Sequence, residues 1–271
     1  MTRRDLLSTF AAMPVAAAGK PRVFALIGDK PHNSDYIRTA LARTLAQGLG
    51  LDIDFTDEVR QLSARTLASY RLLVILRDGM TWPDGYPDET SNAGYLRAGS
   101  PPVVSDPPLP KSDPKPHMWM TGEQGRAVKQ FIQNGGGALL LHNVTHIALV
   151  NRPFRDVLGA AYAGHPPVRT FKVRVKNHDH PVTRGIGDFV VTDEQHFMEY
   201  DRDRATILLE SVNEQGLEWQ NMGTTAPAGW ALDYGKGRFC YFSPGHMLSV
   251  LWNPEYVKLQ QNAVRWLLRQ I

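Results

Sequence analysis

The chain has 271 residues, of which 42% are hydrophobic and 21% charged, the composition of an ordinary globular protein large enough to bury a core. Its 30 Lys and Arg against 27 Asp and Glu leave a net charge of +3, and no block of like charge occurs. These values exclude disordered and collagen-like chains and argue against nucleic acid as a partner. The single cysteine, Cys240, rules out an intrachain disulfide framework and a thiolate metal cluster.

Residues 1–18 have the order of an export signal. Arg3 and Arg4 precede an apolar run from Leu6 to Ala18, and three alanines come before Gly19. This order predicts a signal peptide of the twin-arginine type and a periplasmic or secreted mature protein. An amphipathic first helix of the fold is the alternative. No stretch reaches the roughly 18 uninterrupted apolar residues of a membrane span, so no span is predicted in the mature chain.

Strands and helices alternate along the first half of the chain. Short apolar runs predict buried parallel strands at Arg22–Ile27, Leu51–Phe55, Leu72–Leu76 and Ala138–Leu141. Between them, helices are expected after an N-cap at Ser34, around residues 63–69, and after Thr121, where Gln124 would complete a capping box. The alternation predicts one α/β domain with a doubly wound, mainly parallel sheet.

The second half adds strands and a closing helix. Alternating or apolar runs predict strands at residues 171–175, 207–209 and 238–242, and Asn253-Pro254-Glu255 predicts the start of the last helix. Residues 79–119 contain nine of the 19 prolines, which predicts an irregular insertion. An insertion of this length is expected to be a lid, a contact surface or disordered.

Histidines and acids fall at the ends of predicted strands, where loops of open α/β sheets converge and chemistry collects. Imidazole and carboxylate groups are good ligands for zinc, manganese or nickel. The candidate metal ligands are His142, His165, Glu194, His196 and His246. The alternative is that some of them are hydrogen-bonded structural groups. His146 lies four residues after His142, but no helix signal accompanies that spacing.

Other chemistries lack support. Cys240 lies inside a predicted strand, where a buried thiol is inert. The sequence has no nucleophile elbow and no glycine-rich phosphate loop, so no nucleotide cofactor is expected. Glu194 follows a predicted strand and is a candidate general acid or base. The candidate platforms for stacking against a sugar ring are Trp82, Trp119, Trp230 and Trp252, and the alternative is that they are core residues.

Several motifs, in this order, resemble the ThuA-like (trehalose utilisation) family, whose fold is that of class I glutamine amidotransferases. The matching stretches are Gly135-Gly136-Gly137 to His142, Gly164-His165-Pro166, His180-Pro181 with Gly185, Asp193-Glu194, Trp230 to His246, and a histidine after the first strand, His32. The resemblance implies a flavodoxin-like sheet with His142 where an amidotransferase holds its cysteine, and His246 near the position of the catalytic histidine. Glutaminase activity is therefore not expected.

The resemblance also implies a substrate class. The family is associated with trehalose and related disaccharides, through oxidised keto-sugar intermediates. Where the family has Asp-Glu-Leu-Tyr, this chain has Asp193-Glu194-Gln195-His196, so the substrate need not be shared.

Two hypotheses follow. In the first, the chain is an exported enzyme for metal-assisted hydrolysis or isomerisation of a carbohydrate, with His142, Glu194 and His246 as catalytic residues and His32, Asn143 and Trp230 as substrate-binding residues. In the second, a degenerate amidotransferase fold binds a sugar or a partner protein without catalysis. A homo-oligomer is left open in both.

Overall fold

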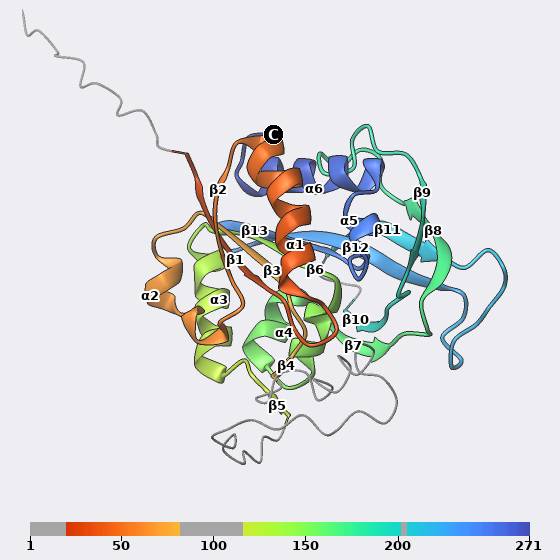
Figure 1. Ribbon diagram of the computed structural model, residues 1–271, viewed down its shortest axis with the longest axis horizontal. Coiled ribbons are helices and arrows are strands. Elements are labelled where there is room, and N and C mark those ends of the chain that lie inside the picture. The colour runs from red at the N-terminus through yellow and green to blue at the C-terminus, as the bar shows by residue number, and fades with distance from the viewer. Residues whose placement is uncertain (1–19, 82–115, 202–204) are drawn as a thin grey trace, which may run out of the picture.

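A nine-stranded sheet forms the centre of the protein, with helices on both faces (Figure 1). The computed structural model describes residues 20–81, 116–201 and 205–271. The predicted signal peptide and most of the predicted insertion therefore lie outside the described residues. No helix in the described part of the chain is long and apolar enough to cross a membrane.

Five parallel strands make the first half of the sheet. In spatial order they are β2 (Asp52–Thr56), β1 (Arg22–Ile27), β3 (Leu72–Leu76), β6 (Gly137–Leu141) and β13 (Gly237–Phe242). Every residue of β3 and β6 is buried, as expected for strands covered on both faces. This is the flavodoxin-like strand order, and it confirms the predicted fold class.

Antiparallel strands make the second half. They are β12 (Thr225–Tyr234), β11 (Thr206–Val212), β8 (Arg169–Val175) and β9 (Phe189–Asp193). Two small ribbons complete the strands: β7 (Ala160–Gly164) with β10 (Phe197–Tyr200), and β4 (Met80–Thr81) with β5 (His117–Met118). Neither ribbon is predicted from the sequence.

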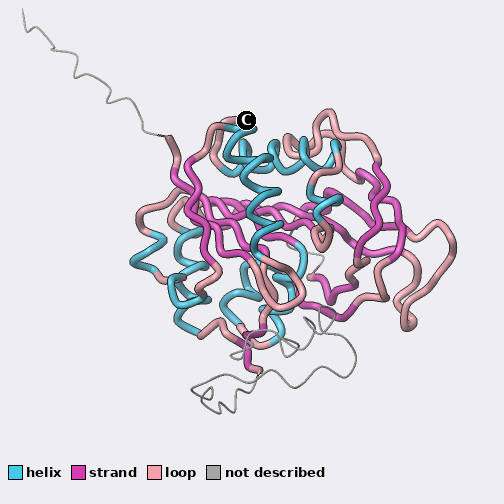
Figure 2. Tube along the Cα trace, viewed as in Figure 1, coloured by secondary structure: helices cyan, strands magenta, loops and turns pink. Residues whose placement is uncertain are grey.

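Two helical layers enclose the sheet (Figures 1 and 2). One layer holds α1 (Ser34–Leu41), its π-helical continuation (Ala42–Gln47), α5 (Leu248–Leu251) and α6 (Pro254–Leu267). The other holds α2 (Ala64–Leu67), α3 (Gly122–Gln133) and α4 (Arg152–Leu158). Successive residues of β1 enter different cores, because side chains of a strand alternate between its faces.

The N-terminal residues of two helices can be compared with the caps predicted from the sequence. Thr121 and Gln124 form the predicted capping box at α3. Asn33, not Ser34, caps α1, since its side chain accepts a hydrogen bond from the Asp35 amide. Short 3₁₀ helices span Val59–Gln61 and His142–Leu149. No helix is predicted after His142, so the 3₁₀ helix at His142–Leu149 corrects that expectation.

Candidate functional site

Four loops bring histidines and an acid together at one edge of the sheet. His32 follows β1, His142 follows β6, and His246 follows β13. The carboxyl ends of these parallel strands share an edge. Glu194 follows β9. Four successive antiparallel pairings lead across the sheet from β13 to β9, so β9 runs in the same direction as β13. The sheet topology therefore places four distant segments at one site.

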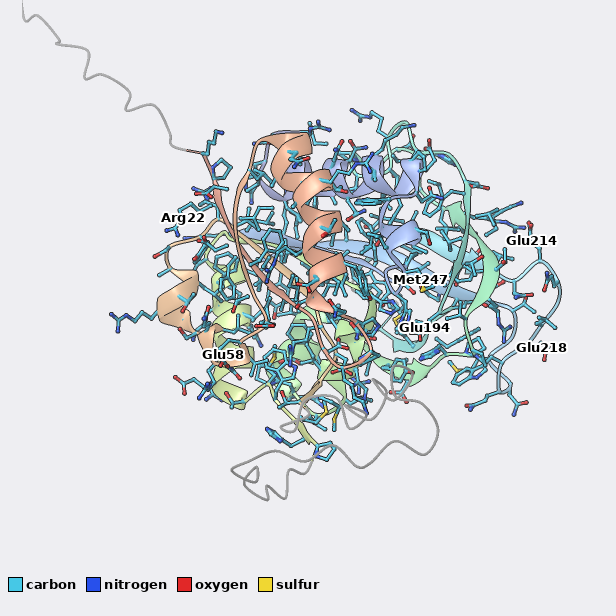
Figure 3. The ribbon with its side chains drawn as sticks, viewed as in Figure 1. Arg22, Glu58, Glu194, Glu214, Glu218 and Met247 are labelled. Atoms are coloured by element: carbon cyan, nitrogen blue, oxygen red, sulfur yellow. The ribbon has the colours of Figure 1, made fainter. Side chains whose placement is uncertain are left out.

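The ligand atoms of these four residues all lie within 4.8 Å of one another. His32 Nε2 is 3.1 Å from His142 Nε2 and 2.9 Å from His246 Nδ1. The Glu194 carboxylate lies 3.3 Å from His142 Nε2 and 3.3 Å from His246 Nδ1. In Figure 3 Glu194 lies within the outline of the molecule, whereas the exposed Glu214 and Glu218 lie at its edge.

The backbone at His142 is held in an unusual conformation. Its φ is 54°, in the left-handed region that non-glycine residues rarely adopt. Tyr241 Oη donates a hydrogen bond to the His142 carbonyl, at 2.7 Å. A Cβ on Gly245 would lie 2.9 Å from His142 Cβ, so only glycine permits this approach of the β13 loop. A strained residue between a strand and a helix is typical of functional sites.

Outer contacts fix the orientation of each ring. His142 Nδ1 donates to the Ser243 carbonyl at 2.8 Å, which leaves Nε2 facing the cluster. His32 Nδ1 lies 2.6 Å from Asp29 Oδ1, and Asn143 donates to the other Asp29 oxygen. Metal-binding histidines usually hydrogen-bond a carboxylate or carbonyl through the second ring nitrogen in this way.

A buried carboxylate positions the fourth loop. Asp193 is fully buried, and it accepts hydrogen bonds from the backbone amides of Gly245 and His246 at 2.7 and 3.2 Å. Burial raises the pKa of Asp193, while the charge of His142 opposes the rise. The two neighbouring acids therefore have different contacts: Asp193 binds the backbone of the His246 loop, and Glu194 faces the histidine cluster.

The electrostatics of the metal-free site favour a positive charge at its centre. Burial would lower the pKa of His142, but Glu194 and Asp193 outweigh it and the pKa is raised. Burial would raise the pKa of Glu194, yet its histidine neighbours hold that pKa far below the usual range. Burial lowers the pKa of His32 despite its hydrogen bond to Asp29. Glu194 therefore stays ionised, which suits a ligand better than a proton donor.

The donor set and spacing fit a divalent ion. Ligands that lie about 2.0–2.1 Å from a tetrahedral zinc ion lie about 3.3–3.4 Å from one another. The closest distances between the cluster atoms, 2.9 to 3.3 Å, are close to this spacing. Three imidazoles and one carboxylate suit zinc or nickel. His32, predicted to bind substrate, also lies in the group that could hold a metal ion.

A second group shares Glu194. His165 Nε2 and His196 Nε2 lie 3.5 and 3.3 Å from Glu194 Oε2. Burial, followed by the charge of His142, lowers the pKa of His196 to about 3, so this imidazole is neutral. All five predicted metal ligands are thus brought together, although no single set contains them all.

Trp230 does not belong to the site, which corrects its assignment as a sugar platform. Its side chain is fully buried, and its indole N–H donates to the Leu158 carbonyl at 2.9 Å. The ring packs 4.2 Å from that of Tyr241. A ligand cannot reach a side chain enclosed in this way. His180 likewise has a structural contact, because its Nδ1 accepts a hydrogen bond from the Val182 backbone amide in the same turn.

The structure adds four residues that sequence reasoning did not assign to the site: Asp29, Asp78, His146 and Tyr162. The two aspartates each follow a strand closely, a signal that could have identified them. Burial and the charge of Asp29 raise the pKa of Asp78 to about 7. Burial raises the pKa of Tyr162 to about 12, so its hydroxyl remains a hydrogen-bond donor.

His146 lines the pocket but is not part of either ligand group in the described residues. On a 3₁₀ helix, which has three residues per turn, a residue four positions on does not share a face with the first. His142 and His146 therefore point in different directions despite their sequence spacing.

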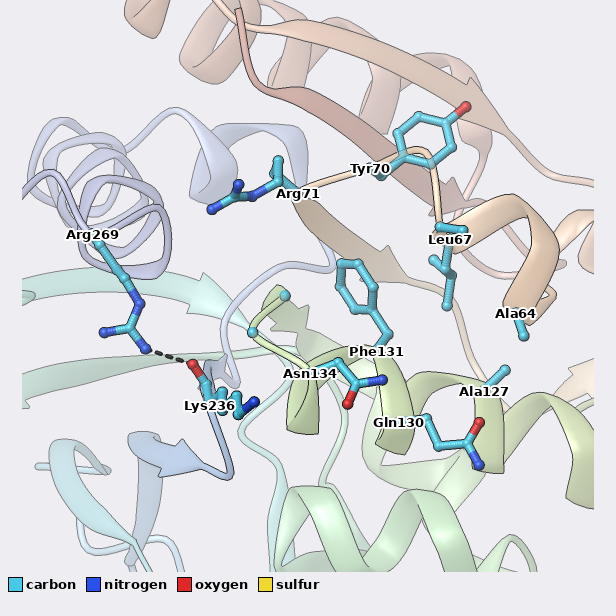
Figure 4. Close-up of a pocket in the computed structure, with 13 residues that line it drawn as sticks. Ala64, Leu67, Tyr70, Arg71, Ala127, Gln130, Phe131, Asn134, Lys236 and Arg269 are labelled. Atoms are coloured by element: carbon cyan, nitrogen blue, oxygen red, sulfur yellow. Dashed lines mark hydrogen bonds between the residues drawn. The ribbon is translucent and has the colours of Figure 1, made fainter. Parts of the chain in front are cut away.

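A pocket of about 200 Å³ lies beside the cluster. Its walls include His32, Asp78, Asn143, Tyr162 and His165. A larger hollow of about 510 Å³ lies at the opposite end of the sheet, between α2, α3 and the C-terminus (Figure 4). Lys236, Arg71 and Arg269 border it, but neither ligand group does. The chemical groups gather at the smaller pocket.

Fold and site together define an amidotransferase-like α/β protein that carries histidine at the position after β6. The chain belongs to the ThuA family, described as trehalose utilisation, whose family model matches residues 114–267. This confirms the resemblance drawn from the sequence motifs.

Solved structures show the same fold. A ThuA-like protein from Bacteroides uniformis is 18% identical with a TM-score of 0.63, over 94% of this chain and 95% of that chain. One from Parabacteroides merdae is 16% identical with a TM-score of 0.63, over 93% and 91%. A glutamine amidotransferase from Thermotoga maritima is 12% identical with a TM-score of 0.52, over 92% and 98%. No curated protein is significantly similar to the chain.

Proposed function

We propose that this protein is a metal-dependent enzyme that acts on a carbohydrate, by hydrolysis or isomerisation. The observation that carries the proposal is the convergence of His32, His142, Glu194 and His246 within 4.8 Å, with outer hydrogen bonds that orient the histidine rings. A bound divalent ion supplies Lewis acidity, which polarises a carbonyl or lowers the pKa of water.

A carbohydrate substrate is supported by the family description and by the pocket. The family model is described as trehalose utilisation. Asp78, Asn143 and Tyr162 present polar groups along the pocket wall. The volume, about 200 Å³, is below the roughly 300–1,000 Å³ of pockets that enclose drug-sized ligands. We therefore propose that one sugar ring, such as the ring of a keto-sugar, enters the pocket.

The pocket residues have distinct proposed roles. Asp78 has a pKa of about 7, which suits a group that exchanges protons at neutral pH. Tyr162, protonated at neutral pH, donates a hydrogen bond to a sugar oxygen. Because Glu194 remains ionised, we assign proton transfer to Asp78 and metal binding to Glu194.

The test combines metal content with turnover. Elemental mass spectrometry on tag-free protein is expected to find zinc, manganese or nickel, and His142→Asn is expected to lose it. Asparagine tolerates the left-handed backbone of His142, so this variant should fold. His178→Asn, at an exposed turn, is the matched control. Keto-sugars and disaccharides are then assayed with the ion present. Sugar binding without turnover would favour a non-catalytic binding module instead.

We also propose that the protein is exported through the signal at residues 1–18. Twin-arginine export carries proteins that are already folded, which suits a chain that acquires a metal ion before it leaves the cytoplasm. Replacing both Arg3 and Arg4 by lysine should retain the protein in the cytoplasmic fraction. An unchanged distribution between the fractions would reject this route.

A further inference from the structure

The second ligand group, His165, His196 and Glu194, is built by an element separate from the main sheet. β7 and β10 pair antiparallel with Gly164 opposite Phe197. His165 follows Gly164 and His196 precedes Phe197, so the pairing brings the two histidines face to face. Their rings stack with centroids 5.1 Å apart and planes 17° from parallel. The small ribbon thus presents both rings to Glu194.

Hydrogen bonding fixes the orientation of His165. Its Nδ1 lies 2.8 Å from the Pro166 carbonyl, which can only accept, so Nδ1 carries the proton. In the neutral ring, Nε2 then directs a lone pair toward Glu194 Oε2, at 3.5 Å. The nitrogen and the anionic oxygen therefore need a positive charge between them, either a proton on Nε2 or a metal ion.

The distances favour a metal ion as that charge. Charge-assisted N–H···O hydrogen bonds are about 2.7–2.9 Å long, whereas ligands of one zinc ion lie about 3.3 Å apart. Glu194 Oε2 is 3.3 Å from His196 Nε2 and 3.5 Å from His165 Nε2. Both separations match shared coordination more closely than hydrogen bonding.

One ion cannot take every donor. The two groups together offer five histidines and Glu194, and they have only Glu194 in common. Zinc in proteins is usually four-coordinate. Carboxylates that belong to two such sets commonly bridge ions about 3.5–4 Å apart in two-metal enzymes.

We propose that a second divalent cation binds His165, His196 and Glu194, and that Glu194 bridges it to the ion held by His32, His142 and His246. The second cation has three protein ligands and an open position toward the pocket, as catalytic ions do. The His165 side chain is 28% exposed and that of His142 is fully buried. The second cation is therefore the one that substrate reaches. This inference rests on the proposed first metal site.

The test counts ions in tag-free protein, purified, stripped of metal and titrated with Zn²⁺ alone, by calorimetry and native mass spectrometry. We expect two ions per chain in the wild type and one in His165→Asn, with the Kd of the second ion at least 100-fold weaker. His165 is used because it is partly exposed, and His165→Gln provides a second variant. His178→Asn should retain both ions. Manganese loading should give the paramagnetic resonance spectrum of a coupled pair in the wild type and of isolated ions in the variant.

The alternative outcomes are distinct. One ion in the wild type that His165→Asn leaves in place overturns the second site, while the proposed function stands. One ion lost in both His165→Asn and His142→Asn shows a single shared ion and also overturns it. No ion in any preparation rejects the first metal site together with the second.

Discussion

The Nε2 atoms of His32 and His142 lie 3.1 Å apart, although 110 residues separate them along the chain. Each ring engages an acceptor through Nδ1, Asp29 for His32 and the Ser243 carbonyl for His142. If a metal ion replaces the proton between them, both Nε2 lone pairs can face that ion. With Glu194 and His246 beside them, these two ring nitrogens form a group of donor atoms that could hold one divalent ion.

Asp29→Asn should weaken metal binding without removing a ligand. The carboxylate orients His32 and increases the basicity of its Nε2, and loss of such an outer partner typically costs 10- to 100-fold in metal affinity. Competition with a chromogenic chelator measures the change. Asp54→Asn, on β2 and paired with Arg22, is the control and should bind metal as the wild type does. Equal affinity in the two variants would show that Asp29 does not support the site.

Gly245→Ala should disturb His142 directly. The added Cβ would lie 2.9 Å from His142 Cβ, closer than real contacts of this kind, so the β13 loop must shift. We expect metal affinity and turnover to fall at least tenfold. Gly187→Ala is the matched control, since its nearest neighbour would be at an ordinary 3.9 Å. Metal titration and circular dichroism separate a shifted site from a general loss of folding.

Asp78→Asn should change how stability depends on pH. Burial, followed by the charge of Asp29, raises the folded-state pKa of Asp78 from 3.8 to about 7, against the attraction of Arg77. The folded protein therefore keeps a proton that the unfolded chain releases, and this group lowers stability as pH rises from about 4 to 7. The variant should be more stable than the wild type above pH 7, by at most about 4 kcal/mol.

Thermal unfolding of metal-free protein at pH 4 and pH 8 measures this effect. The stability difference between Asp78→Asn and the wild type should appear at pH 8 and shrink toward pH 4. A difference that is the same at both pH values would mean that Asp78 has an ordinary pKa. Loss of turnover in this variant would independently support its role in proton transfer.

Trp230→Phe should destabilise the protein and leave its binding site intact. The change removes the indole donor and leaves the buried Leu158 carbonyl without it, which costs about 1–3 kcal/mol. Denaturant unfolding measures the loss, and sugar binding should stay within twofold of the wild type. A large change in sugar affinity at unchanged stability would show that Trp230 does contribute to sugar binding.

Local sequence signals determined much of the framework. The predicted strands at β1 and β3 match the observed strands residue for residue, because the residues of a strand that are buried on both faces must be apolar. The capping box of Thr121 and Gln124 also formed as predicted, since its hydrogen bonds join residues three apart. The family motifs also indicate the fold.

Tertiary structure decided which residues form the site. Glu194 reaches the histidines only because four antiparallel steps return β9 to the direction of β13, and no local pattern encodes that path. The division of the ligands into two groups depends on the pairing of β7 with β10, which the sequence did not reveal. Trp230 entered the core for a similar reason: burial depends on what packs over a side chain, and those neighbours are distant in sequence. Sequence therefore specified the strands and the chemical groups, whereas long-range strand pairing determined which groups meet.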